Sequence, residues 1–170
     1  MAYAANTSVP VERSRAEIER LLSRHKCKKF LAGVDHDAHT ATVQFHAYNR
    51  IIRFIIGLPD PKDKKYTRDR RGYTAPAHVV DKLVAQDERT RWRALLLVIK
   101  AKLEAVESNI ATFEDEFLAH VVLPNQQTVA QYIGPAVAQM CETGRMAPDR
   151  MLNGTVEEGT TVDAVREDSR

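Results

Sequence analysis

The chain has few cysteines, few aromatic residues and no long apolar run. Its 170 residues include two cysteines, Cys27 and Cys141, which form neither a Cys-x-x-Cys motif nor a disulfide framework. This usage is typical of a reducing cytoplasm, where we expect the protein to act. No stretch approaches the roughly 18 apolar residues that a membrane helix needs, so no membrane partner is expected. Met1 to Val9 have neither a basic start nor an apolar centre and predict no secretory signal.

Motifs that identify common enzymes and cofactors are also missing. None of the seven glycines belongs to a phosphate-binding loop. The sequence has no nucleophile elbow and no Ser, His and Asp series, and neither cysteine has the local pattern of a catalytic thiol. These absences favour a protein without enzymatic activity and without a cofactor.

The net charge is small but unevenly distributed. In total, 25 Lys and Arg residues against 23 Asp and Glu residues give +2. Residues 1–109 contain 21 basic and 13 acidic side chains, a net charge of +8, whereas residues 110–170 contain 4 and 10, a net charge of −6. Such a split is typical of a basic body that binds an anionic partner, or of an acidic segment that screens a basic one.

The first part of the chain is predicted to form one helix and a small sheet. Ser14 and Glu17 match a capping box, and the apolar residues after them recur at helical spacing, which predicts a helix over 14–25. The period then changes to two, which is typical of strands. Three strands joined by short turns should form an antiparallel meander. These strands are expected over residues 29–34, 40–47 and 50–57.

The second part is predicted to be helical. A long loop over 58–77, rich in proline and charge, precedes a long helix over about 78–108. Thr112 is expected to cap a short helix, and Thr128 with Gln131 forms a further capping box. The predicted fold class is α+β, in the order α-β-β-β-α-α-α, with a three-stranded antiparallel meander packed against the long helix.

Composition also divides the chain into three parts. Residues 1–13 are small and polar and predict a flexible arm. Residues 14–144 carry the apolar periodicity and predict a single α+β domain, with Gly144 as the stop of its last helix. Residues 145–170 have little periodicity and predict a disordered C-terminal tail.

The main candidate site is the basic segment 62–73. Its six Lys and Arg side chains face only two aspartates, and two tyrosines interleave with them. Cations bind phosphates through counterion release, and a tyrosine can stack on an unpaired base. Arginines of the long helix would extend the patch, although Arg91 lies on a different helix face from Arg89 and Arg93. The predicted nucleic-acid-binding residues are Lys62, Lys64, Lys65, Tyr66, Arg68, Arg70, Arg71, Tyr73, Arg89 and Arg93. The alternatives are a solvated charged loop and an acidic protein partner.

Histidine and acidic residues cluster in one expected turn. Asp35, His36, Asp37 and His39 are residue types that bind divalent metals, and a metal-bound water there would support a nuclease. The same residue types are common in exposed hairpin turns, so we favour a plain turn and predict no metal site.

A second such group lies on the short helix after Thr112. Glu116 and His120 are four residues apart on one face, a spacing that suits a metal or acid–base chemistry. Acids in the first turn, such as Glu114 and Asp115, also stabilise a helix N-terminus, which favours a structural role. His46, on the polar side of a strand, is expected to be solvated.

Apolar residues form a stripe along the long helix at spacings of three and four. The stripe consists of Trp92, Leu95, Leu96, Ile99 and Leu103. It predicts core packing against the sheet, with a homodimer seam as the alternative. Leu97 and Val98 lie off the stripe, and this surplus is expected to be covered by later helices or to contact another copy or a host protein.

Four segments resemble small proteins of tailed phages and prophages to which no activity is assigned. They are Val9–Ser14, Trp92–Glu107, Thr112–Leu118, and Leu123-Pro124 followed by Thr128-Val129. The likeness covers roughly residues 9–148, and its most specific part is Trp92–Leu118. Such proteins usually carry a glycine after Leu-Pro, where this chain has Asn125-Gln126-Gln127, so the turn geometry is expected to differ. The resemblance implies a mobile-element origin and a bacterial cytoplasm, and it carries over no catalytic residue.

The leading hypothesis is a non-enzymatic accessory protein of phage type that binds single-stranded or duplex nucleic acid through its basic segment. The second is a protein–protein interaction module, either a homo-oligomer or an inhibitor of a host factor. The third is a metal-dependent nuclease.

Overall fold

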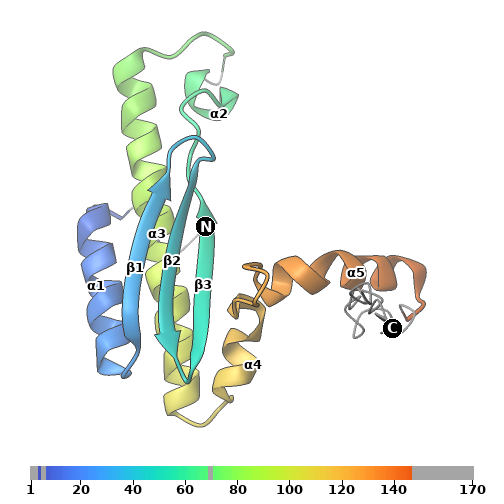
Figure 1. Ribbon diagram of the computed structural model, residues 1–170. Coiled ribbons are helices and arrows are strands. Elements are labelled where there is room, and N and C mark those ends of the chain that lie inside the picture. Colours follow the sequence, from blue (N-terminus) through green and yellow to red (C-terminus); the bar gives the residue numbers. More distant parts are fainter. Residues whose placement is uncertain (1–3, 5–6, 69–70, 147–170) are drawn as a thin grey trace, which may run out of the picture. The chain divides into compact units, whose positions relative to one another are not determined.

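The computed structural model describes residues 4, 7–68 and 71–146. In this part of the chain the predicted α+β fold and the order of its elements are confirmed, with a short helix inside the loop before the long helix as an addition. The elements are α1 (Val11–Arg24), β1 (Lys28–Asp35), β2 (Thr40–Ala47), β3 (Arg50–Gly57), α2 (Lys64–Thr67), α3 (Ala77–Glu107), α4 (Phe113–Phe117), the 3-10 helix η1 (Leu118–His120) and α5 (Val129–Thr143) (Figure 1).

The chain divides into two compact units, residues 1–132 and 133–170. The first unit contains the sheet and all helices up to the start of α5. Of the second unit, the structure describes only the remainder of α5 and the residues up to 146. Gly144 follows α5 with a φ of 63°, as expected for the glycine that ends a helix. The predicted tail lies almost entirely outside the described residues, and the arm and single domain stay predictions.

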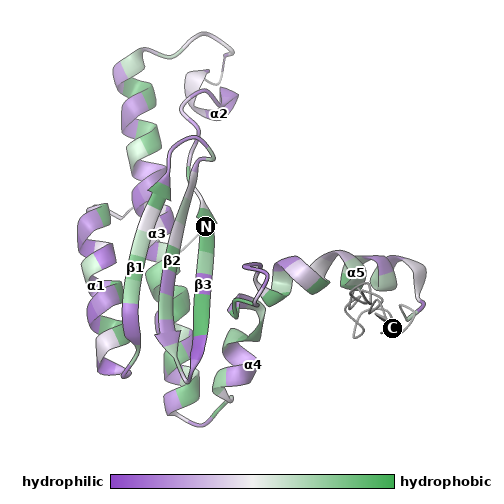
Figure 2. Ribbon diagram, in the orientation of Figure 1, coloured by the Kyte–Doolittle hydropathy of each residue, from purple (hydrophilic) through white to green (hydrophobic). Residues whose placement is uncertain are grey.

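The three strands form an antiparallel meander in the order β1-β2-β3. Neighbouring residues of β2 point to opposite faces, so Val43, opposite Phe54, lies in the core, whereas Gln44, opposite Arg53, lies on the outer face. Tyr48 and Asn49 turn the chain between β2 and β3 with positive φ angles of 48° and 59°, the geometry of the two-residue turns that suit the twist of a hairpin. Figure 2 shows the resulting apolar character of β3, interrupted at its middle by a polar residue.

Helices α1 and α3 cover one face of the sheet (Figure 1). The stripe along α3 is buried there, which confirms the core interpretation of Trp92, Leu95, Leu96, Ile99 and Leu103. Leu97 is half-buried, and Val98 remains 46% exposed. Oligomerisation and a host partner stay predictions.

Helix α4 closes the core at the edge of β3. Thr112 caps it as predicted, because its hydroxyl accepts from the Asp115 amide at 3.1 Å and the Asp115 carboxylate accepts from the Thr112 amide at 3.1 Å. Phe117 is fully buried and meets the rings of Phe45 and Phe54 edge-on, at centroid distances of 6.2 and 6.3 Å. The capping box of Thr128 and Gln131 is also confirmed at the start of α5.

The capping box predicted at Ser14 is wrong. Helix α1 begins at Val11, three residues earlier than expected, so Ser14 lies inside the helix instead of before it. Ser14 stands four residues before Ile18, and this spacing places both side chains on the buried face. The Ser14 hydroxyl is completely buried and has no hydrogen-bond partner among the residues that the structure describes.

Replacing Ser14 with alanine should therefore stabilise the protein. The change removes an unsatisfied buried hydroxyl and inserts the residue with the best helix propensity, which together should raise the free energy of unfolding by about 1 kcal/mol. Urea denaturation followed by circular dichroism measures it. Ser23→Ala is the matched control, since Ser23 is exposed and already donates to the Glu19 carbonyl at 2.9 Å. A gain no larger for Ser14→Ala than for this control would contradict the prediction.

Within the part of the chain that the structure describes, no helix combines the length and the apolar character needed to cross a bilayer.

Candidate nucleic-acid interface

The loop predicted over 58–77 is more ordered than its composition suggests, because it contains α2. The Asp63 carboxylate accepts from the Lys65 amide at 3.0 Å and caps this helix. The Asp60 carboxylate accepts from the Lys62 amide at 2.8 Å in the preceding turn. After α2, the Ala75 amide donates to the Thr67 carbonyl at 2.8 Å and brings the chain back toward α3. Two of the acidic side chains of the loop are therefore engaged by backbone amides.

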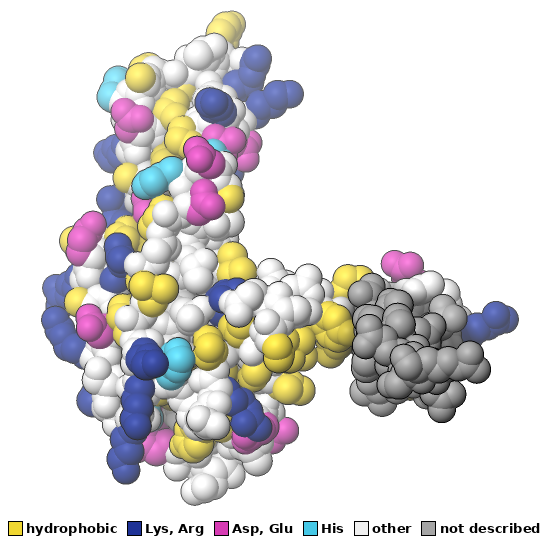
Figure 3. All heavy atoms as spheres, in the orientation of Figure 1, with side chains coloured by type: hydrophobic (Ala, Val, Ile, Leu, Met, Phe, Trp, Pro, Cys, Tyr) yellow, Lys and Arg dark blue, Asp and Glu magenta, His cyan; other side chains and the backbone are white. Residues whose placement is uncertain are grey.

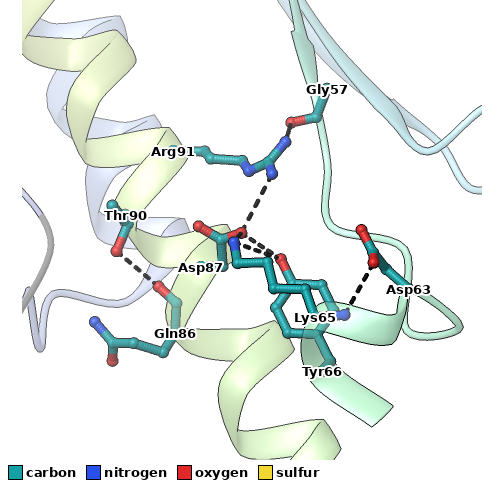
Figure 4. Close-up of polar contacts among 8 residues, drawn as sticks. All are labelled: Gly57, Asp63, Lys65, Tyr66, Gln86, Asp87, Thr90 and Arg91. Carbon is teal, nitrogen blue, oxygen red and sulfur yellow. Dashed lines mark hydrogen bonds and ion pairs between the residues drawn. The ribbon is translucent and has the colours of Figure 1, made fainter. Parts of the chain in front are cut away.

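Helix α2 is held to α3 by a cluster of polar contacts centred on Asp87, shown in Figure 4. Tyr66 is only 4% exposed, and its hydroxyl donates to the Asp87 carboxylate. The same carboxylate oxygen accepts from Lys65 Nζ at 3.1 Å and from Arg91 Nη2 at 3.2 Å. Arg91 also donates through Nη1 to the Gly57 carbonyl, at the end of β3. We call Lys65, Tyr66, Asp87 and Arg91 the Asp87 clamp.

The charges of the Asp87 clamp follow from its surroundings. Burial alone would raise the pKa of Asp87, but the hydrogen bonds from Tyr66, Lys65 and Arg91 outweigh it and hold the pKa below its ordinary value. Burial and the bond to Asp87 raise the pKa of Tyr66, and the bond to Asp87 raises the pKa of Lys65. The clamp therefore holds a carboxylate, a neutral phenol and two cations at neutral pH.

A group of exposed cations lies around α2, next to the clamp and close to the end of the sheet where β3 finishes. These residues, which we call the α2 cluster, are Lys62, Lys64, Lys65, Arg68 and Arg71. Figure 3 shows dark-blue side chains around α2, with magenta acidic side chains next to them. Arg68 donates to the Gly72 carbonyl at 3.0 Å, which shapes the turn after α2. Tyr73 follows in the same turn and is 71% exposed.

The structure changes three parts of the predicted interface. Tyr66 is buried in the clamp, so its ring is not exposed for stacking on a base as the prediction needs. Arg89 and Arg93 lie on another face of α3: Arg89 donates to Gln86 at 2.7 Å, and Arg93 pairs with Glu17 of α1 at 2.6 Å. Arg91 is the arginine that reaches the loop. Arg70 lies outside the described residues.

No protein-family model, curated protein or solved structure matches this chain. The resemblance to phage and prophage proteins therefore stays a prediction from the sequence. A fold does not by itself fix an activity, so the function has to be inferred from the side chains that the fold brings together.

Asp35, the first acidic residue of the turn from Asp35 to His39, has a structural role. The Asp35 carboxylate accepts from the amides of Asp37 and Ala38, at 3.0 and 2.9 Å, and so closes an Asx turn. His39 lies 3.7 Å from the Asp60 carboxylate, in the loop before α2. Among the residues that the structure describes, no group of three His, Cys, Asp or Glu side chains is placed to hold a metal ion.

Glu116 and His120 do not act as a pair. The Glu116 carboxylate accepts from Lys102 of α3 at 3.1 Å. The His120 ring stacks on Phe54 with a centroid distance of 4.0 Å, and burial together with the nearby charge of Lys102 lowers its pKa. Both side chains therefore fix η1 and α4 against the core. His46 is half-exposed on the outer face of β2, in line with the expected solvated position.

Proposed function

We propose that this protein binds nucleic acid at the α2 cluster, mainly through phosphates. The observation that supports this most directly is the concentration of five exposed cations around a single helical turn. Asp63 and Asp60 accept from backbone amides, and Asp87 is neutralised within the clamp. Because Lys65 is paired with Asp87, the cluster meets phosphates mainly through its other exposed cations.

The clamp also anchors α2, the helix that carries Lys64 and Lys65 of the cluster. A loop with mobile cations loses conformational freedom when it binds, whereas cations on an anchored helix lose less. Tyr73, exposed beside the cluster, can stack on an unpaired base, which favours single strands over duplex. In this proposal the chain is a non-enzymatic accessory protein of a phage or prophage that acts in the cytoplasm of a bacterial host. The origin and location rest on the sequence resemblance alone.

Removing three cations of the cluster should weaken binding and reduce its salt dependence. The variant Lys62→Ala, Lys64→Ala, Arg71→Ala loses up to three phosphate contacts, so the slope of log affinity against log salt should fall by as much as about 2 for single-stranded DNA. At low salt the affinity should fall at least roughly tenfold. A fluorescence-anisotropy titration with a labelled oligonucleotide, repeated at several salt concentrations, measures both quantities.

The matched control is Arg13→Ala, Arg20→Ala, Lys100→Ala, which removes the same charge from exposed or partly exposed positions on α1 and α3. Its effect on affinity should be several-fold smaller, because only the general attraction of the body is reduced. Equal affinities of the two triple variants would show that the α2 cluster is not the binding surface.

A further inference from the structure

A hollow of about 240 Å³ opens at the opposite end of the sheet from α2. It lies where the end of α1, the turn between β2 and β3 and the last turns of α3 come together. Leu103 and Val106 of α3 line its apolar part. We call it the turn hollow, and it shares no residue with the α2 cluster.

One wall of the turn hollow is aromatic. Tyr48, at the tip of the turn, packs on Phe113 of α4 with a ring-centroid distance of 4.5 Å and an interplanar angle of 34°. Phe113 is buried, whereas Tyr48 remains 64% exposed. An exposed aromatic ring that is supported from behind is a ready platform for a flat, uncharged ring such as a nucleobase.

The rim of the turn hollow is cationic. Arg24 and Lys26, at the end of α1, are exposed, and neither forms an ion pair with any residue that the structure describes. Glu107 of α3 also lines the hollow, with one carboxylate oxygen 3.7 Å from Nδ1 of His25, the residue between the two cations. An aromatic platform, two cations and a carboxylate within one small hollow match the base, the phosphate and the sugar hydroxyls of a nucleotide.

Two of these side chains, Lys26 and Tyr48, stand at turn positions whose backbone geometry favours glycine or asparagine. Lys26 follows α1 with a φ of 59°, in the turn that the Cys27 amide closes on the Leu22 carbonyl at 3.0 Å, where glycine is the usual residue. Tyr48 has a φ of 48° at a turn position that favours asparagine or glycine. Positive φ is unfavourable for bulky side chains, and it also occurs outside the hollow at Lys29, His39 and Gln126, so it supports the site only together with the aromatic wall and the charges.

We propose that the turn hollow binds a nucleotide, with its base on Tyr48, its phosphate at Arg24 and Lys26, and its sugar hydroxyls near Glu107. The ligand is either a free nucleotide or one unit of a nucleic-acid strand, since both offer the same groups. The site goes beyond the phosphate contacts of the α2 cluster and does not depend on them.

Isothermal titration calorimetry of the full chain with adenosine monophosphate tests the proposal, with adenosine and inorganic phosphate as separate probes. We expect the nucleotide to bind more tightly than either part. Tyr48→Asn should weaken nucleotide binding at least about tenfold, as expected for loss of base stacking, while Tyr48→Phe retains it. Lys26→Gly should weaken binding of the nucleotide and leave adenosine unchanged.

The melting temperature separates this site from a structural role of the same residues. Lys26→Gly relieves positive-φ strain, so this variant should melt at or above the wild-type temperature although it binds the nucleotide less tightly. Tyr48→Asn also loses the packing of its ring on Phe113, so it should melt below the wild type and below Tyr48→Phe. No heat of binding with the nucleotide, or equal binding by wild type and Tyr48→Asn, would overturn the proposal. The α2 triple variant should bind the nucleotide as wild type does. A failure of the nucleotide site can therefore be told apart from a failure of the proposed nucleic-acid site at the α2 cluster. If the α2 triple variant still binds an oligonucleotide and Tyr48→Asn weakens that binding, the ligand is one unit of a nucleic-acid strand. If the triple variant binds the nucleotide but shows no such Tyr48-dependent binding of an oligonucleotide, the ligand is a free nucleotide.

Discussion

Replacing Trp92 with alanine is expected to lower the free energy of unfolding by about 3–5 kcal/mol. Trp92 is completely buried on α3 and belongs to the core that joins α1, α3 and the sheet. The Arg15 guanidinium lies 5.5 Å from the centre of its ring and covers it on the side of α1. Because domains of this size are stable by only about 5–15 kcal/mol, a loss of this size should leave the variant close to unfolding.

Urea denaturation followed by far-ultraviolet circular dichroism measures the loss, since Trp92 is the chain's single tryptophan and its fluorescence disappears with it. Trp92→Phe is the control. It keeps an aromatic ring in the core and removes a buried indole N–H that finds no acceptor in the described part of the chain. Its cost should be smaller, about 1–2 kcal/mol. Equal losses for the two variants would mean that the ring does not fill the core as described.

The fold could be predicted wherever one face of an element is buried. The alternation along β2 and the stripe from Trp92 to Leu103 both report the direction of the core, and both are confirmed. Helix α2 was missed because four residues are too few to show a period. Ser14 was misassigned because its match to a capping box was stronger than the weak apolar signal of the three residues before it.

The candidate site was predicted less completely, because it depends on contacts between distant segments. The basic character of segment 62–73 is a property of composition and could be recognised. The burial of Tyr66 could not, since it follows from Asp87, 21 residues later. The pair of Asp87 and Arg91 could have been predicted, because residues four apart lie on one face of a helix and oppositely charged side chains there form ion pairs. The turn hollow combines residues of α1, the β2–β3 turn, α3 and α4, which no local pattern joins.

Replacing Asp87 with alanine should both destabilise the protein and weaken nucleic-acid binding. The change leaves the buried Tyr66 hydroxyl without its acceptor and removes the contact that joins Lys65 and Arg91, which we expect to cost about 2–3 kcal/mol. Helix α2 would then lose its anchor on α3. The affinity for single-stranded DNA should fall several-fold even though the net positive charge increases by one, because the cations are no longer held in place.

Asp81→Ala is the matched control, since Asp81 is exposed on the same helix and its loss changes the net charge equally. A simple charge effect predicts tighter binding by both variants, whereas an anchoring role predicts weaker binding by Asp87→Ala alone. Denaturation and anisotropy titrations on the two variants separate these outcomes, and equal or tighter binding by Asp87→Ala would remove the clamp from the binding mechanism.

The pH dependence of stability gives an independent test of the clamp. The pKa of Asp87 is held below its ordinary value in the folded protein, so its contribution is present above the unfolded-state pKa and is lost as the pH falls through the folded-state pKa. The stability difference between wild type and Asp87→Asn should therefore be constant above about pH 5 and shrink below about pH 4. If the carboxylate were merely solvated, the difference would be small at every pH. A difference that is large at neutral pH and disappears in acid thus assigns the anchoring of α2 to the charged form of Asp87.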